Sequence, residues 1–266
     1  MQIAHGPFSL VAAPAQGGRV ARFGHADLGA LLVPMEDAPF DAFAWPKAGA
    51  FPLIPFHGRI ETARFDWHGT RHQITPHPGP DGHALHGPAQ RLPWRAERLS
   101  AGALRMDLEV DAGADWPFAF AASQKITLND NGLRIDMTMT NRAETTAPAG
   151  LGWHPYFPKS TLEHDAQSHW PMRTGTLFPS GRYSKTVPQV TGKTTFLSDW
   201  SSVTLHNATI RLRLTSDLAH LVLHDDPPTH TCVEPASEPA NALNLEGADT
   251  FNPGETLTAR IDLILM

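Results

Sequence analysis

The stretch KITLNDNGLRIDMTMTN, residues 125–141, decides the fold because hydrophobic and polar residues alternate on both sides of a turn signal. Alternation with a period of two is the pattern of a half-buried β-strand. In the second half of the stretch it puts four apolar side chains on one face: Leu133, Ile135, Met137 and Met139. The intervening NDNG, residues 129–132, favours a tight turn because Asn-Gly tolerates positive φ at low cost. The stretch therefore predicts a β-hairpin.

The same alternation recurs in most of the chain. Residues 104–112 (LRMDLEVDA) and 257–266 (LTARIDLILM) each predict one more strand. Residues 64–74 (RFDWHGTRHQI) predict a hairpin around His68-Gly69. Residues 203–214 (VTLHNATIRLRL) predict another hairpin around Asn207.

Helices of normal length are not expected. No segment repeats apolar residues at spacings of three and four over a dozen positions, and 24 Pro and 21 Gly interrupt the chain. Long Pro-rich loops are expected at residues 34–55 and 75–93, and loops of that length are usually functional or partly mobile. The alternation alone thus predicts an all-β fold of two packed antiparallel sheets.

Length and composition indicate one domain spanning residues 1–266, since all-β sandwiches of this size commonly form a single unit. The contents of 41% hydrophobic and 18% charged residues are those of an ordinary soluble globular protein. A net charge of −6, without a cluster of Lys and Arg, argues against a nucleic-acid partner. No apolar run is long enough to span a membrane.

The single cysteine, Cys232, excludes an intrachain disulfide framework and suits a reducing compartment. The first residues, MQIAHGPFSLVAAPAQGG, lack the basic segment of a secretory signal, and Pro14 interrupts their apolar stretch. We therefore expect a cytoplasmic protein.

GLGWHPYF, residues 150–157, isolates one histidine, His154, in an apolar and aromatic run. Histidine both donates and accepts protons near neutral pH. Gly150 and Gly152 permit a close approach of the backbone to another group, a ligand being one option. Taken alone, the motif is more often that of a hydrogen-bonded core histidine, so its interpretation depends on three further segments.

Two of these segments add basic residues. LHGPAQRLPW places His86 directly before Gly87 in a Pro- and Gly-rich loop, and loops on a rigid scaffold often carry catalytic side chains. FPLIPFHGRI is an apolar run from which Arg59 emerges. In isolation His86 is by default a surface residue, and Arg59 is more often a solvated strand end.

The third segment, CVEPASEPANAL, places Glu234 where a buried strand reaches the rigid turn of Pro235. A carboxylate in that position is either part of a salt bridge or available as a base. Burial would raise its pKa toward the range that a base needs near neutral pH.

In this order the four segments resemble those of the aldose 1-epimerase (galactose mutarotase-like) family, over most of the chain from GGRVARF at residues 17–23 to NPGET at residues 252–256. The resemblance implies a large antiparallel β-sandwich, the galactose mutarotase-like supersandwich. It implies an isomerase that interconverts the anomers of an aldohexose, with a small-molecule sugar as its substrate and no cofactor. We expect a monomer or a weak homodimer.

The matched motifs also imply individual roles. Glu234 stands where the family has its carboxylate base, His154 where it has the His before Tyr-Phe, and His86 where it has the His of a His-Gly pair. Arg59 follows an apolar, Pro-containing strand, as does the family's Arg that holds sugar hydroxyls. A looser match assigns Asp199, in FLSDWSSVTL, to the sugar hydroxyls as well.

Mutarotation requires removal of the proton on O1 and delivery of a proton to the ring oxygen O5. We expect Glu234 to be the base and His154 the acid, with the roles reversed when the ring closes. His154 would then start protonated, which a nearby Glu234 or Asp199 would favour. His86 would hydrogen-bond O5 or a neighbouring hydroxyl.

Departures from the family pattern leave the identity of the sugar open. Gly58 stands where an Asn often precedes the Arg, and EPASEPANAL is closer to the bacterial branch that includes hexose-6-phosphate mutarotases. Arg91, five residues after His86, would join Arg59 or Arg19 in binding an anionic group at C6. A loop-capping or ion-pairing role for Arg91 is the alternative. A phospho- or sulfo-hexose is therefore a second candidate substrate.

Other functions compete with this interpretation. A non-catalytic carbohydrate-binding module would stack sugars on aromatic residues, namely Trp153, Trp94 and Phe56. A related sugar-phosphate or sugar-acid epimerase is a further alternative, whereas a glycosidase needs two carboxylates with a geometry that nothing in the sequence specifies. Although the chain has 15 His, it has no HExxH motif and no cysteine pair, so we expect no required metal.

Overall fold

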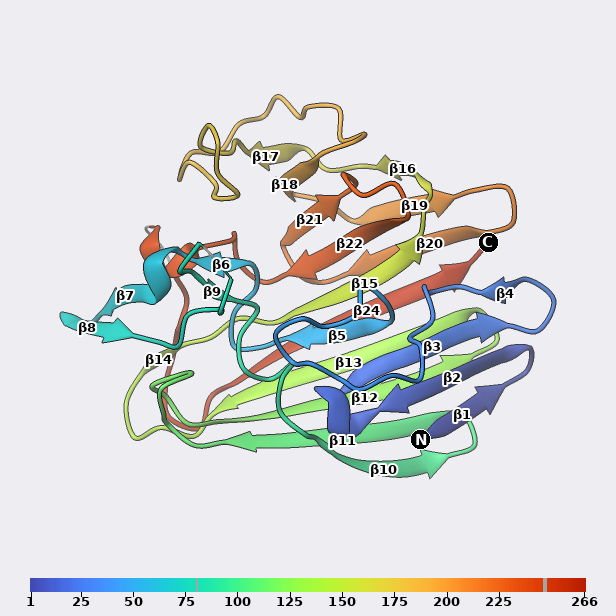
Figure 1. The fold of residues 1–266 in the computed structure, drawn as a ribbon, viewed down its shortest axis with the longest axis horizontal. Coiled ribbons are helices and arrows are strands. Elements are labelled where there is room, and N and C mark those ends of the chain that lie inside the picture. The colour runs from blue at the N-terminus through green and yellow to red at the C-terminus, as the bar shows by residue number, and fades with distance from the viewer. Residues whose placement is uncertain (80, 246–247) are drawn as a thin grey trace.

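The structure is a computed structural model that describes residues 1–79, 81–245 and 248–266. In this part of the chain the regular secondary structure is almost entirely β-strand, and the strands form two large antiparallel sheets and three two-stranded ones (Figure 1). In the described part of the chain, the only helical elements are three short 3₁₀ turns: η1 (Pro14–Gln16), η2 (Glu61–Ala63) and η3 (Ala242–Asn244). The prediction of an all-β fold with large antiparallel sheets is confirmed.

The first large sheet has ten strands and carries the candidate site. Its order is β1 (Gln2–His5), β2 (Phe8–Ala13), β3 (Arg19–His25), β5 (Ala50–Leu53), β15 (Gly152–Pro158), β22 (His230–Ala236), β21 (His220–His224), β18 (Thr194–Ser198) and β17 (Ser168–Trp170), and β4 (Gly29–Ala30) pairs with β3. The central strands β5, β15 and β22 thus come from distant parts of the chain.

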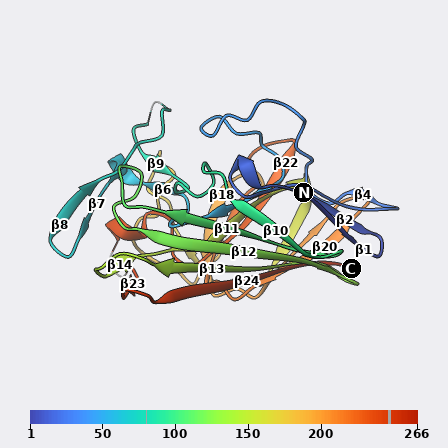
Figure 2. The same ribbon diagram turned by 90° about the horizontal axis from the view of Figure 1, so that it is seen from below.

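The second large sheet has eight strands. Its order is β10 (Arg95–Ser100), β11 (Ala103–Val110), β12 (Phe120–Asn129), β13 (Gly132–Asn141), β24 (Thr256–Leu265), β20 (Arg211–Ser216), β19 (Ser202–His206) and β16 (Thr161–His164). Figure 2 shows β11, β12, β13 and β24 side by side in one layer, with β22 and the β6 and β9 segments above them.

Three two-stranded sheets complete the fold. They pair β6 (Arg59–Ile60) with β9 (Ala84–Leu85), β7 (Arg64–Trp67) with β8 (Thr70–Gln73), and β14 (Ala147–Pro148) with β23 (Thr250–Phe251). The hairpins predicted around His68-Gly69 and around Asn207 are β7–β8 and β19–β20, so both predictions are confirmed.

The hairpin predicted at residues 129–132 joins β12 and β13, and Asn129 pairs with Gly132 across a two-residue turn. The glycine has a different function from the one predicted, since it ends the turn instead of forming it. Its φ is 144°, and a Cβ atom there would lie 2.2 Å from the backbone oxygen of Leu263 on β24. Gly132 is therefore required because a neighbouring strand packs against it.

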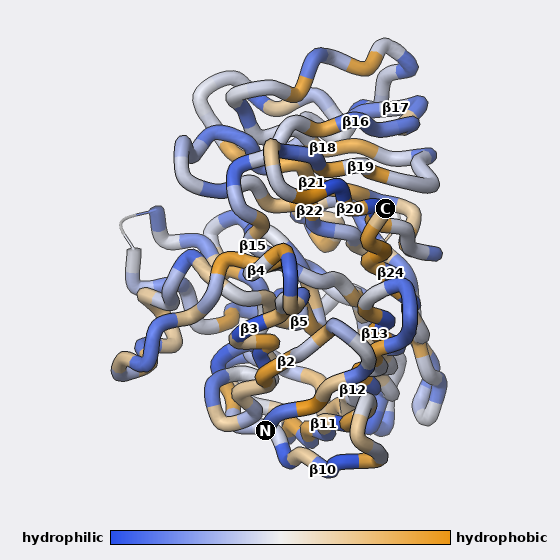
Figure 3. The backbone as a smooth tube through the Cα atoms, turned by 90° about the vertical axis from the view of Figure 1, so that its right-hand side faces the viewer, coloured by the Kyte–Doolittle hydropathy of each residue, from blue (hydrophilic) through white to orange (hydrophobic). Residues whose placement is uncertain are grey.

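The hydrophobic core lies between the two large sheets. Its largest cluster joins fully buried residues of the ten-stranded sheet, such as Leu10 and Phe23, to those of the eight-stranded sheet, such as Met106 and Ile135. Along these strands hydrophobic and hydrophilic positions follow one another closely, as the alternation predicted (Figure 3).

Strand β15 is buried on both faces along its first six residues. At its start Gly152 pairs with Ala236 of β22, and this register places His154 opposite Glu234. A Cβ atom at Gly152 would lie 2.9 Å from the backbone oxygen of Pro235 and 3.2 Å from Leu53 Cβ. The close approach that the sequence predicted here is thus made to neighbouring strands, and the ligand option was wrong.

Replacing Gly152 with Ala should lower the free energy of unfolding by about 1–3 kcal/mol, because the added methyl group overpacks the junction of β5, β15 and β22. Gly113→Ala is the matched control, since a Cβ atom there meets nothing within 4 Å. Urea denaturation of both variants measures the difference. Equal stability of the two variants would contradict the close packing at Gly152.

Candidate active site

Four neighbouring strands of the ten-stranded sheet form one row of side chains across its centre. Phe51 on β5 pairs with His154 on β15, and Glu234 on β22 pairs with Val222 on β21. Side chains that pair directly across antiparallel strands share a face. The sheet therefore brings together two of the residues assigned from the sequence, His154 and Glu234, which are far apart along the chain.

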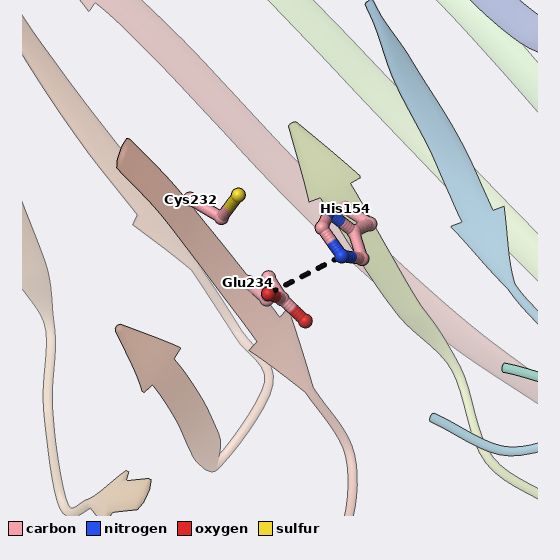
Figure 4. A group of neighbouring side chains, drawn as sticks. All are labelled: His154, Cys232 and Glu234. Carbon is pink, nitrogen blue, oxygen red and sulfur yellow. Dashed lines mark ion pairs between the residues drawn. The ribbon is translucent and has the colours of Figure 1, made fainter. Parts of the chain in front are cut away.

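The side chains of His154 and Glu234 point toward one another (Figure 4). Their closest atoms, His154 Nε2 and Glu234 Oε1, are 3.4 Å apart, and the two side chains are only 7% and 6% exposed. This separation is slightly longer than an ordinary hydrogen bond. A small shift on binding of a substrate is enough to make a direct hydrogen bond, which is common at catalytic sites without substrate.

Aromatic rings hold the imidazole of His154 in place. The ring of Phe51 stacks on it at a centroid distance of 4.6 Å, and that of Tyr156 at 4.7 Å. Trp45 Nε1 donates a hydrogen bond of 3.0 Å to the hydroxyl of Tyr156. Within the described chain, His154 Nδ1 has no hydrogen-bond partner. Stacking therefore fixes the orientation that directs Nε2 toward Glu234.

Burial changes the acidity of both groups. It raises the pKa of Glu234 to about 8, which confirms the expected direction. It also lowers the pKa of His154 well below the ordinary value, with repulsion from the neighbouring basic side chains of His86 and Lys47 acting in the same direction. The expectation that nearby carboxylates would favour a protonated His154 is wrong for the free protein, because desolvation and these basic neighbours disfavour the charged imidazole. Near neutral pH the pair is uncharged, with its proton on Glu234.

His86 and Arg59 are brought together by the small sheet β6–β9, in which Arg59 pairs with Leu85. The backbone N–H of His86 donates to the Gly58 carbonyl at 2.9 Å, and the Gly58 N–H donates to His86 Nδ1 at 3.2 Å. Because Nδ1 accepts this hydrogen bond, the ring proton of neutral His86 is on Nε2. His86 packs edge-on against His154, with ring centroids 5.1 Å apart.

These residues line a cavity of about 470 Å³, a volume within the usual range for small-molecule sites. The sheet contributes its floor, which consists of His154, Glu234, Val222, Phe196 and, one row further, Tyr156, His224 and Thr194. Loops and the small sheet β6–β9 contribute the walls, including Trp45, Lys47, Arg59 and His86. Among the described lining residues, Glu234 is the only acid, whereas Lys47, Arg59 and six histidines are basic.

A family model described as aldose 1-epimerase matches residues 1–261. The chain belongs to the aldose 1-epimerase family. A curated relative, the uncharacterized protein YphB of Escherichia coli K12, is 32% identical over 145 residues, which are 53% of this chain and 48% of YphB. The matched segment thus spans about half the length of that relative.

Solved structures agree with this family membership at the level of the fold. A galactose mutarotase-like protein from Clostridium acetobutylicum has a TM-score of 0.87 and 14% identity, with 100% of this chain and 94% of that chain covered. A GalM/aldose epimerase homologue from C. elegans has a TM-score of 0.83 and 16% identity, with 100% and 98% covered. The galactose mutarotase-like fold that the sequence predicted is therefore confirmed.

None of the helical segments among the described residues of this aldose 1-epimerase family member has the length and apolar character that a membrane crossing requires. The single domain, the cytoplasmic location and the monomeric or weakly dimeric state stay predictions.

Three residues assigned to the sugar lie outside the cavity lining of this family member. Trp153 is fully buried, because it alternates with His154 along β15 and so points to the opposite face, into the core. Asp199 accepts hydrogen bonds from Ser168 and Lys185 at the outer end of β18. These placements correct both assignments.

Arg91 is the third residue assigned to the sugar that lies outside the cavity lining. Its guanidinium pairs with Asp115 at 3.1 Å and lies over the ring of Phe43, so Arg91 has the ion-pairing role that was the alternative to substrate binding. Arg19, considered with it, is fully buried behind the site, 4.2 Å from the centroid of Phe51, and burial lowers its pKa to about 10. Neither guanidinium lines the cavity.

The sequence interpretation missed Lys47 and the histidines at positions 224 and 230. Lys47 lies in the Pro-rich segment at residues 34–55, which was expected to be a functional or partly mobile loop without any residue being singled out. His224 and His230 lie at the two ends of the connection between β21 and β22. The alternation of residues 220–236 could have revealed them. It places both histidines an even number of residues from another cavity position on the same strand, and thus on the same face of the sheet.

Replacing Glu234 with Gln tests whether the carboxyl group is buried and protonated. Its folded-state pKa is raised from 4.5 to about 8, so the folded protein keeps a proton that the unfolded chain releases in this interval. The stability contributed by the neutral carboxyl is complete below pH 4.5 and is lost as the pH rises through about 8. Relative to Glu234→Gln, the wild-type free energy of unfolding should fall by about 1 kcal/mol per pH unit.

Urea titrations of both proteins at about pH 5.5, 6.5 and 7.5 measure this difference. The other buried groups titrate in both proteins and cancel in the comparison. A difference that does not change with pH would contradict the raised pKa of Glu234.

Proposed function

We propose that the protein is an aldose 1-epimerase that interconverts the α and β anomers of an aldohexose by ring opening and closure. The proposal rests on one observation above all, the buried His154–Glu234 pair on the floor of a sugar-sized cavity. Ring opening of a hemiacetal needs one group that accepts a proton and one that donates a proton. The pair supplies both groups on neighbouring strands that hold them at a fixed separation.

The protonation of the pair suits a reaction that must run in both directions. Glu234 takes the proton from O1 while His154 gives one to O5, and after ring opening Glu234 is protonated and His154 is neutral. This is the charge state that burial favours in the free protein. Closure on the other face returns both protons. The ionic and neutral forms of the pair contain the same total number of protons, so a transfer between Glu234 and His154 converts one into the other.

The other cavity residues position the sugar in this proposal. The Nε2–H of His86 is free to donate to O5 or to a neighbouring hydroxyl, because Nδ1 already accepts from Gly58. Arg59 pairs with Asp81 at 3.2 Å, which fixes its guanidinium at the edge of the cavity as a donor to sugar hydroxyls.

The binding-module alternative has less support. Its proposed stacking platforms, Trp153, Trp94 and Phe56, are all buried in the core and do not face the cavity. A module would have to stack sugars on other aromatic residues and would not need the His154–Glu234 pair.

Purified protein should accelerate the interconversion of the anomers of freshly dissolved α-aldohexoses without added metal or nucleotide. Glu234→Gln should lower kcat by about 10²-fold or more, since it removes the base but keeps the shape. Polarimetry or NMR exchange spectroscopy measures both. Glu238→Gln is the matched control, because burial raises its pKa to about 8 as well but it does not line the cavity.

Near-wild-type kcat in Glu234→Gln would sink the assignment of the base. If the protein binds aldohexoses but accelerates the interconversion of the anomers of none of them, the binding module is favoured instead.

A C6-anionic hexose is the second candidate substrate, and the charge of the cavity favours it. Lys47 has its ammonium nitrogen 4.4 Å from the centroid of the Trp45 ring, and burial lowers its pKa. Among the described residues, it makes no ion pair within 4.0 Å. Since Arg91 lies outside the cavity, Lys47 replaces it as the proposed contact for a phosphate or sulfonate.

Lys47→Met should raise KM for a hexose 6-phosphate by about 10-fold or more, because charge-assisted hydrogen bonds contribute about 1.5–3 kcal/mol. KM for glucose or galactose should change by less than about 3-fold. The exposed Lys125→Met is the control for a change in net charge. An equal rise in KM for neutral and anionic sugars would show that Lys47 does not contact the anionic group at C6.

A further inference from the structure

A third side chain lies beside the His154–Glu234 pair and has no role in the proposed reaction. Cys232 precedes Glu234 by two residues on β22 and therefore lies on the same face of the sheet (Figure 4). One ligand atom from each of His154, Cys232 and Glu234 can be chosen so that all three lie within 4.8 Å of one another. Among the described residues, this is the one group of three such side chains.

The separations suit a tetrahedral metal ion. Two ligand atoms that are each about 2.0 Å from zinc lie about 3.3 Å apart at the tetrahedral angle. The observed separation of His154 Nε2 and Glu234 Oε1 is 3.4 Å. This is too long for a good hydrogen bond but is the spacing of two zinc ligands. The sulfur of Cys232, whose bond to zinc would be about 2.3 Å, completes the set within the 4.8 Å that the three chosen ligand atoms span.

The donor set indicates the class of metal. Imidazole, thiolate and carboxylate together suit Zn²⁺ and related borderline or soft divalent ions, and they do not suit Mg²⁺ or Ca²⁺. A thiolate and a carboxylate also balance the two charges of the ion, which a buried site requires.

The position of the group also indicates which side of the ion stays open. Cys232 is fully buried, whereas His154 and Glu234 line the cavity. An ion held by the three would therefore direct its remaining coordination position into the cavity, where a water molecule or a sugar hydroxyl would occupy it.

We propose that His154, Cys232 and Glu234 form a binding site for Zn²⁺ or a similar divalent ion, and that the ion inhibits the enzyme. Coordination occupies the lone pairs with which His154 and Glu234 would exchange protons with the sugar. The inhibition rests on the proposed mutarotase function, whereas the metal binding does not depend on it.

Cobalt binding tests the site without any assay of activity. Because the chain has one cysteine, a thiolate-to-Co²⁺ charge-transfer band in the near ultraviolet would report on Cys232 alone. The band should appear when Co²⁺ is added to the wild-type protein, and Zn²⁺ should remove it by competition. Cys232→Ala and Cys232→Ser should both lack it, and two variants guard against a folding defect in one of them.

Activity then tests the inhibition. Zn²⁺ should slow mutarotation by the wild-type protein, and EDTA should restore the full rate. Cys232→Ala should keep the basal rate and raise the inhibitory Zn²⁺ concentration by at least about 10- to 100-fold, the loss typical of removing even an outer partner of a metal site.

Two outcomes would overturn the proposal. One is a wild-type protein in which Co²⁺ gives no thiolate band. The other is zinc inhibition that persists in both Cys232 variants but disappears in His224→Asn, which would place the ion at the histidines His224 and His230. If no sugar is a substrate, the cobalt band still decides whether the metal site exists, so failure of the proposed function and failure of this proposal are distinguishable.

Discussion

The register between β15 and β22 is the constraint on which the candidate site depends. It pairs Gly152 with Ala236 and so brings His154 opposite Glu234. A slip of one residue would turn every side chain of β15 to the other face, which would put Trp153 in the cavity and His154 in the core. The close contacts at Gly152 hold the register at one end, since no larger residue fits between Leu53 and Pro235.

The same burial that shapes the chemistry carries a cost in stability. Glu234 is kept neutral in the free protein, and Nδ1 of His154 has no hydrogen-bond partner in the described chain. Polar groups buried without full satisfaction destabilise a folded protein by about 1–3 kcal/mol each. Contacts of the His154 ring with the rings of Phe51 and Tyr156 offset part of this cost and also keep the imidazole in the orientation that the proposed reaction needs.

The sequence predicts the sheets well because one face of most strands is polar. In β13 the alternation identifies the buried residues correctly: Leu133 and Ile135, for example, are buried as predicted. Strand β15 is buried on both faces, so its sequence contains no signal that distinguishes the face of His154 from the face of Trp153. The assignment of Trp153 to the sugar was wrong for that reason.

Charged residues were predicted less well because their partners are distant or lie in loops. The ion pair of Arg91 with Asp115 and the contacts of Asp199 with Lys185 and Ser168 follow from tertiary structure and have no local signature. The order of the motifs along the chain identified four residues that line one cavity in the fold, namely His154, Glu234, His86 and Arg59.

In the proposed function, catalysis and sugar recognition rest on different parts of the molecule. The His154–Glu234 pair comes from paired strands in the middle of a ten-stranded sheet, where hydrogen bonds on both sides fix its geometry. Trp45, Lys47 and His77, which line the cavity above the pair, come from loops between strands. Loops tolerate substitution far better than central strands do. Changes in Lys47 and its neighbours can therefore alter which sugar binds while leaving the separation between His154 and Glu234 intact. For this reason the sequence identifies the reaction of this family more readily than the substrate of one member.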